Sequence, residues 1–114
     1  KIAGGEILVE VADTSEKRVQ GLSGRESLPP DTGLIFVFDT PGKYGFWMKN
    51  MKFSIDIAWI DETLQVVGVE RLINPDTYPK VFYPPGNIKY VLEIGAGEAQ
   101  KYGIDIGQFI SYLQ

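Results

Sequence analysis

The sequence contains no cysteine and no histidine. The lack of cysteine excludes disulfides, thiolate nucleophiles and cysteine-based metal sites, and the lack of histidine removes the commonest metal ligand and general base in proteins. Apolar runs are short as well. The longest aliphatic and aromatic block covers residues 34–38, far below the roughly 18 residues that a membrane-spanning helix requires. From these absences we expect no metal, no cofactor and no membrane span.

Positive charge is also scarce. The chain carries 11 Lys and Arg against 15 Asp and Glu, which gives a net charge of -4, and its cations are scattered without a basic run. A negatively charged molecule without a basic patch is poorly suited to the phosphate backbone of nucleic acids. No nucleic acid partner is therefore expected.

What is present is the composition of a folded domain. The chain has 114 residues, of which 44% are hydrophobic and 12% aromatic. A chain of this length can bury roughly two thirds of its unfolded surface and needs no disulfide or metal to hold its core. We therefore expect residues 1–114 to form a single domain, and we expect it to be a monomer.

The first elements can be placed from local signals. Apolar residues alternate over residues 7–11, which predicts a half-buried strand. Asp13 or Thr14 can cap the N-terminus of a following helix of two to three turns, which Gly21 or Gly24 would end.

Short strands and turns dominate the rest of the chain. Strands are predicted at residues 34–38, 44–48, 53–61, 64–73 and 89–94, with a final extended piece at residues 109–113. The segments between residues 44 and 73 are expected to be consecutive antiparallel strands.

The region from residue 74 to 87 holds four prolines and predicts an ordered loop, and residues 97–102 predict a short helix that ends at Gly103. The pattern as a whole predicts a mainly β fold, α+β at the margin. It would be a compact β-sandwich or partly closed barrel with two short helices.

Three stretches have the residues and spacing of one known family. They are Arg18-x-x-Gly21-Leu22-x-x-Arg25-x-x-Leu28-Pro29 followed by Gly33-Leu34-Ile35-Phe36-Val37-Phe38, then Phe46-Trp47-Met48-Lys49-Asn50 followed by Ile55-Asp56-Ile57 and Asp61, and finally Tyr90-Val91-Leu92-Glu93 with Gly97 and Gly103-Ile104. Over residues 9–107 the chain resembles the bacterial and archaeal family called domain of unknown function 192. It departs from that pattern at Met51, Ser54 and Gln108, where threonine, proline and aspartate are typical.

The resemblance implies a small β-rich domain with no established reaction. Family members are often exported or lipid-anchored, so an extracytoplasmic location (periplasmic, secreted or lipid-anchored) is expected, while a cytoplasmic one stays open. The sequence begins at Lys1, which fits either a removed signal peptide or a trimmed chain.

Two arginines in the first stretch are candidate anion ligands. Arg18 and Arg25 are seven residues apart, so a helix that continued this far would place both on one face. Two guanidinium groups could then bind a carboxylate, sulfate or phosphate. In the alternative, each arginine pairs with a carboxylate such as Asp56 or Glu93 and holds the helix to the sheet.

The aromatic stretch offers a second candidate group. In a strand, Trp47 and Lys49 would share one side and Asn50 the other. The indole could provide a stacking surface and the lysine a charge for a sugar or a small acid, with Asn50 adding directional hydrogen bonds. The alternative is a core tryptophan beside a lysine at the sheet edge.

Asp56 and Glu93 lie within apolar strand segments and need partners if they are buried. Structural ion pairs are one interpretation. The other is a general acid and base for glycan cleavage, which requires a particular separation across a cleft.

The sequence thus supports three hypotheses. The first is an extracytoplasmic domain that binds a small polar or anionic ligand, such as a saccharide or carboxylate, through Arg18, Arg25, Trp47, Lys49, Asn50, Asp56 and Glu93. The second is a glycan-active hydrolase or lyase that uses Asp56 and Glu93, although the sequence leans away from an enzyme. The third is an accessory domain that binds a protein partner through the proline-rich loop and a sheet edge.

Overall fold

The structure, a computed structural model, describes residues 6–111. Its elements in chain order are β1 (Leu8–Ala12), α1 (Ser15–Gln20), β2 (Thr32–Gly42), β3 (Phe46–Trp47), β4 (Ile55–Ile60), β5 (Val66–Ile73), the 3-10 helix η1 (Pro75–Thr77), β6 (Val81–Phe82), β7 (Ile88–Gly95) and α2 (Glu98–Lys101). The expected mainly β fold with two short helices is confirmed.

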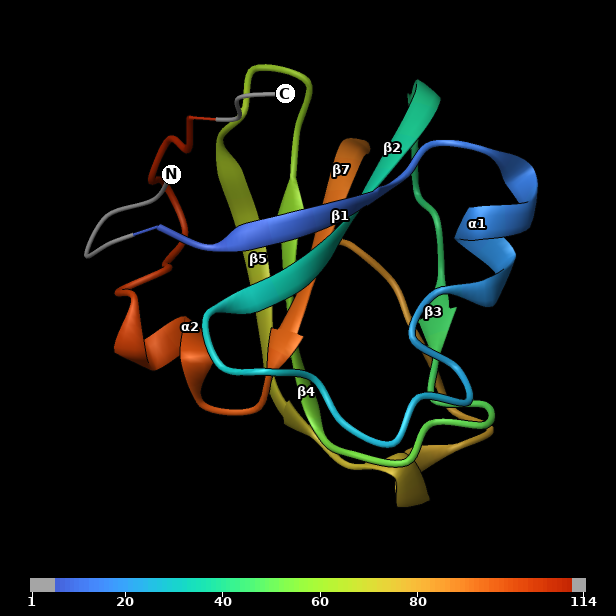
Figure 1. Cartoon of the computed structure of the whole chain (residues 1–114). Coiled ribbons are helices and arrows are strands. Elements are labelled where there is room, and N and C mark those ends of the chain that lie inside the picture. Colours follow the sequence, from blue (N-terminus) through green and yellow to red (C-terminus); the bar gives the residue numbers. More distant parts are fainter. Residues whose placement is uncertain (1–5, 112–114) are drawn as a thin grey trace.

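Most of the strands form one five-stranded sheet in the order β1-β2-β7-β4-β5. The pairing of β1 with β2 is parallel, and the other three pairings are antiparallel. A separate two-stranded sheet joins β3 to β6. The large sheet is open, with β1 and β5 at its edges (Figure 1).

The two faces of the large sheet carry separate cores. In Figure 1, α2 lies to the left of the sheet, and α1 and β3 lie to the right. The core on the α2 side includes Ile35, Ile94 and Tyr102, whereas the core on the α1 side includes Phe36 and Trp59. Alternate residues of each strand therefore enter opposite cores, as a period-two pattern requires.

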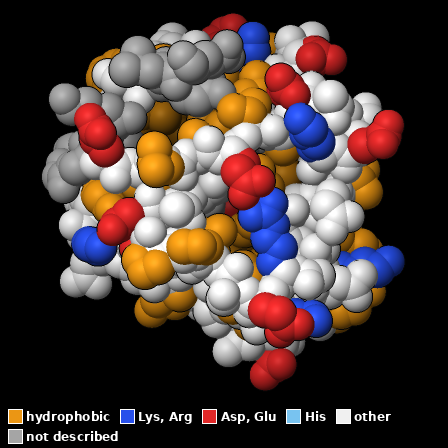
Figure 2. All heavy atoms as spheres, viewed as in Figure 1, with side chains coloured by type: hydrophobic (Ala, Val, Ile, Leu, Met, Phe, Trp, Pro, Cys, Tyr) orange, Lys and Arg blue, Asp and Glu red, His pale blue; other side chains and the backbone are white. Residues whose placement is uncertain are grey.

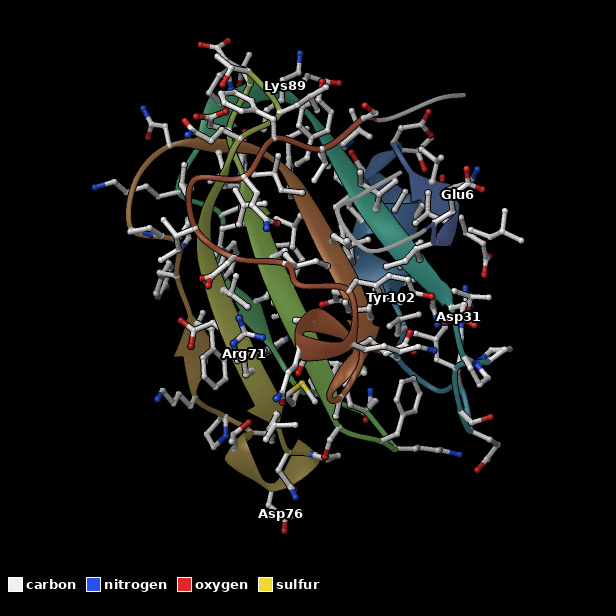
Figure 3. All side chains as sticks on the ribbon, turned by 90° about the vertical axis from the view of Figure 1, so that its left-hand side faces the viewer. Glu6, Asp31, Arg71, Asp76, Lys89 and Tyr102 are labelled. Atoms are coloured by element: carbon white, nitrogen blue, oxygen red, sulfur yellow. The ribbon has the colours of Figure 1, made fainter. Side chains whose placement is uncertain are left out.

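The short helix α2 is tied to the turn before β2. Lys101 and Tyr102 both donate hydrogen bonds to the carboxylate of Asp31, whose own backbone N–H donates to the carboxylate of Glu98. Figure 3 shows Tyr102 and Asp31 next to one another. The bond from Lys101, and after it the bond from Tyr102, lowers the pKa of Asp31.

The local predictions near the N-terminus are largely confirmed. The strand β1 has the expected alternation, and Thr14 caps α1 by accepting a hydrogen bond from the backbone of Lys17. The helix is only six residues long, shorter than predicted, because Gly21 at its C-terminus has a φ of 50° and turns the chain away. The second helix begins and ends as predicted, between Gly97 and Gly103.

The expectation of consecutive antiparallel strands between residues 44 and 73 is only partly correct. The hairpin of β4 and β5 is antiparallel, but β3 pairs with β6 from the proline-rich loop. The reason is that β4 is already paired on both sides, to β5 and to β7, so β3 finds no free edge there. Of the extended piece at residues 109–113, Phe109 forms a bridge with Gln65, and residues 112 and 113 lie outside the described residues.

Between residues 6 and 111, no helix is long and apolar enough to cross a membrane.

Candidate functional site

A pocket with a volume of about 460 Å³ lies on the α1 side of the large sheet. This volume falls in the range of small-molecule sites, roughly 300–1,000 Å³. Its lining comes from α1 and the turn that follows, from β2, from the segment around β3 and from β7. The lining residues are Ser15, Arg18, Val19, Gln20, Gly21, Leu22, Ser23, Phe36, Phe38, Tyr44, Gly45, Phe46, Trp47, Met51 and Glu93.

Aromatic rings form the walls of this aromatic pocket. Phe36 and Phe46 meet edge to face with their ring centres 4.8 Å apart, and Phe38 and Tyr44 are stacked at 3.7 Å. Phe46 also contacts the buried Trp59 at 5.6 Å. Because each of these wall rings packs on another ring, the walls have a defined shape and an apolar aromatic lining.

Glu93 is the only acidic residue in the lining, and it is 6% exposed. It lies on β7 opposite Leu34 of β2 and Ile57 of β4, both buried. Within residues 6–111 its carboxyl group makes no hydrogen bond and no ion pair, and burial raises its pKa to about 8. At pH 7 the group is therefore mostly a neutral carboxylic acid, which can both donate and accept a hydrogen bond.

Arg18 brings a positive charge to the same pocket. Its Nη1 donates a hydrogen bond to the backbone oxygen of Val37 at 2.8 Å, and its guanidinium lies 5.5 Å from the ring centre of Phe38. No carboxylate in the described part of the chain pairs with it. These two contacts orient the guanidinium and leave its other N–H groups free of carboxylates.

Gly21 allows the turn after α1 to come close to the pocket wall. A Cβ atom at this position would lie 3.3 Å from the Phe36 ring, and the backbone has a positive φ that suits glycine. Two further bonds hold this turn: the Ser23 hydroxyl donates to the Lys49 oxygen at 2.9 Å, and the Gly24 N–H donates to the Asn50 oxygen at 2.9 Å.

The predicted Trp47 group is present in part. Trp47 lines the pocket, is 47% exposed, and has the Lys49 Nζ 5.5 Å from its ring centre. Asn50 lies outside the aromatic pocket because β3 ends at Trp47 and the chain turns, with Asn50 at a φ of 60°. The alternation of side chains between the two faces of a strand, expected as far as Asn50, therefore ends at Met48. The Met48 side chain is buried.

The expected pair of arginines does not form. Because α1 ends at Gln20, Arg18 and Arg25 do not share a helix face, and Arg25 lines a neighbouring pocket beside β1. There it makes an ion pair with Glu10, with N–O distances of 2.7 and 3.2 Å. The alternative, in which each arginine pairs with a carboxylate, holds for Arg25, although its partner is Glu10 of β1 and not Asp56 or Glu93. Arg18 has no carboxylate partner within residues 6–111.

Asp56 lies on the opposite face of the sheet from the pocket. Its carboxylate accepts hydrogen bonds from the backbone N–H groups of Leu72 at 2.7 Å, Gly97 at 3.0 Å and Ala99 at 2.9 Å. It therefore has backbone donors in place of the predicted ion-pair partner. The structure does not bring Asp56 and Glu93 together, so they cannot flank one glycosidic bond as a cleavage pair requires.

Sequence reasoning missed the ring walls. The sequence pattern does not identify Phe36, Phe38, Tyr44 and Phe46 as site residues, although the cluster of aromatics at residues 44–48 is a signal that points toward them. No group of three acidic side chains within residues 6–111 is placed to hold a metal ion.

The fold and this pocket together define a small mainly β domain with one buried carboxyl group at an aromatic site. The chain belongs to the DUF192 family, described as "Uncharacterized ACR", whose sequence profile matches residues 1–112. The family resemblance is thereby confirmed.

Known relatives agree with this membership. A UPF0127 protein of Thermococcus sibiricus is 31% identical in an alignment 109 residues long, which covers 91% of this chain and 65% of that protein. A solved structure from Novosphingobium aromaticivorans, of unknown function, superposes with a TM-score of 0.86 at 29% identity and covers 91% of this chain and 74% of its own. Another, from Sinorhizobium meliloti and provisionally described as a transcription regulator, has a TM-score of 0.84 at 28% identity and covers 89% of this chain and 78% of its own.

Proposed function

We propose that this domain binds a small saccharide in the aromatic pocket. The observation that carries the proposal is the carboxyl group of Glu93, which is buried, lines the pocket and has no partner within residues 6–111. Burial disfavours the charged form of this carboxyl group, and the neutral acid presents a donor and an acceptor that hydroxyl groups of a ligand can satisfy.

The rest of the lining favours a sugar among small polar ligands. A sugar ring has apolar C–H faces that can pack on flat rings such as Phe38, Tyr44 and Trp47, and it has hydroxyl groups for the carboxyl group of Glu93. Arg18 supplies further N–H donors at the same site.

Nucleic acid is a weaker candidate ligand, although one similar structure is provisionally described as a transcription regulator. The chain carries a net charge of -4, and the face in Figure 2 intersperses positive and negative side chains without a large basic area. A groove for a phosphate backbone would need such an area.

We also propose an extracytoplasmic location. The support is the family resemblance, which implies exported or lipid-anchored members. Fractionation of cells that express the full-length gene would test it, and recovery with the cytosolic fraction would count against it.

The binding proposal is tested by isothermal titration of the protein with neutral monosaccharides, uronic acids and small carboxylic acids. We expect a neutral sugar to bind and Glu93→Leu to weaken it about tenfold or more, since the leucine side chain can neither donate nor accept a hydrogen bond. Arg25→Ala is the matched control, because Arg25 lines the neighbouring pocket and should leave the affinity unchanged. If no sugar binds the wild type, the proposal is wrong.

A further inference from the structure

Exposed aromatic side chains gather next to the aromatic pocket. In the described part of the chain the exposed large aromatics are Trp47, Tyr78, Tyr83 and Phe109. Three of the four belong to one region: Trp47 is in β3, Tyr78 follows η1, and Tyr83 follows β6, the strand that pairs with β3. These three residues, 43% to 61% exposed, are called here the aromatic platform.

The aromatic platform is continuous with the pocket. Trp47 lines the pocket and also contacts Tyr78, with ring centres 5.1 Å apart and planes inclined by 59°. Tyr83 packs over Gly45, another lining residue, so closely that a Cβ there would lie 2.7 Å from the Tyr83 ring. The apolar surface that begins on the pocket wall thus extends past the pocket edge onto the two-stranded sheet.

Cationic donors border this platform. The Nζ of Lys49 lies 5.5 Å from the Trp47 ring centre, and the Nζ of Lys80 lies 4.7 Å from the ring centre of Phe82 in β6. Neither lysine is in an ion pair within residues 6–111. Partly exposed rings beside N–H donors suit a ligand with apolar faces and hydroxyl edges.

We infer that the ligand is an oligosaccharide, with one sugar unit in the aromatic pocket and the next unit on Trp47 and Tyr78. This inference rests on the proposed function. In this arrangement one end of the oligosaccharide lies in the pocket, and the next unit needs a surface of the same chemistry outside it. Trp47 connects the two, because it lines the pocket and also contacts Tyr78 of the aromatic platform. A protein partner would use the platform without occupying the pocket.

Chain-length dependence of binding is the test. The wild type is titrated with glucose, cellobiose and cellotriose, and with N-acetylglucosamine and its dimer and trimer. We expect the affinity to rise about tenfold from the monosaccharide to the disaccharide of the series that binds. Tyr78→Ala should abolish that rise and leave the monosaccharide affinity unchanged, because Tyr78 lies outside the pocket lining.

Two matched variants make the result specific. Phe109→Ala removes an exposed aromatic from the segment that bridges to Gln65, away from the platform, and should keep the full rise. Tyr78→Leu retains apolar bulk without a flat ring and should behave as Tyr78→Ala, which guards against a folding defect in the alanine variant.

The outcomes separate the two proposals. A monosaccharide that binds with no gain from added units, or a gain that persists in both Tyr78 variants, overturns the oligosaccharide inference and leaves the pocket proposal standing. Failure of every monosaccharide and oligosaccharide to bind overturns both.

Discussion

Asp56 and Glu93 lie on adjacent paired strands and point to opposite faces of the same sheet. Asp56 pairs with Ile94 and Glu93 pairs with Ile57, so the two carboxyl groups are offset by one residue in the register of β4 and β7. One residue of offset changes the face. Asp56 meets three backbone N–H groups near α2, whereas Glu93 enters the aromatic pocket without a partner in the described chain.

The Asp56 carboxylate should stabilise the folded protein. In Asp56→Asn, one of the two oxygens becomes an NH₂ group that cannot accept, so at least one of the bonds from Leu72, Gly97 or Ala99 is lost. We expect the free energy of unfolding to fall by about 1–3 kcal/mol, measured by chemical denaturation. Asp39→Asn, at an exposed position, is the control. An Asp56→Asn variant as stable as the control would contradict this account.

Glu93 should make stability depend on pH in the opposite sense to an ion-paired carboxylate. Its pKa is raised from 4.5 to about 8 in the folded protein, so the native state binds the proton more tightly than the unfolded state. The stabilisation from the neutral form is complete below about pH 4.5 and is lost as the pH rises toward 8.

Relative to Glu93→Gln, the free energy of unfolding of the wild type should fall with pH by up to about 1.4 kcal/mol per pH unit in this window. Other titrating groups cancel in this difference. Urea unfolding of both proteins at a series of pH values measures it, and parallel curves would show that Glu93 is not held neutral.

Any side chain at Gly33 should destabilise the folded protein. A Cβ atom there would lie 2.7 Å from the backbone oxygen of Glu93 and 2.8 Å from the Ile94 side chain, both in the neighbouring strand β7. We expect Gly33→Ala to lower the free energy of unfolding by about 1–3 kcal/mol, since β7 must shift. Gly86→Ala, where nothing lies within 4 Å, is the matched control and should change the melting temperature little.

The Arg25–Glu10 ion pair should contribute little to stability. Its side chains are 36% and 64% exposed, and exposed pairs are typically worth about 0.2–1 kcal/mol. Arg25→Ala should therefore remain close to wild-type stability, and the small difference should shrink in high salt. A loss of several kcal/mol would mean that Arg25 has a packing role at the neighbouring pocket.

Features set by short-range signals could be predicted from the sequence. Thr14 and Gly21 delimit α1, and the alternation in β1 indicated its two faces, because caps and periodicity act over a few residues. The parallel pairing of β1 with β2 and the pairing of β3 with β6 could not, since they join segments far apart in the chain.

The roles of the candidate site residues also depend on long-range pairing, which the sequence does not reveal. In sequence, Asp56 and Glu93 are alike, each an acid within an apolar strand segment, and only the register of β4 against β7 separates their roles. Arg18, Trp47 and Glu93 were singled out from the sequence and do line one pocket. Arg25 does not join them, because α1 ends at Gln20 and the helix face expected to carry both arginines does not exist.

Glu93 lies on β7, the third of the five strands, which is held by pairing on both sides. Several of the pocket walls, by contrast, come from the turn after α1 and from the segment around the two-residue strand β3. Under the proposed function, substitutions and insertions in those wall segments could change which ligand binds, while Glu93 keeps its place in a sheet that such changes leave intact.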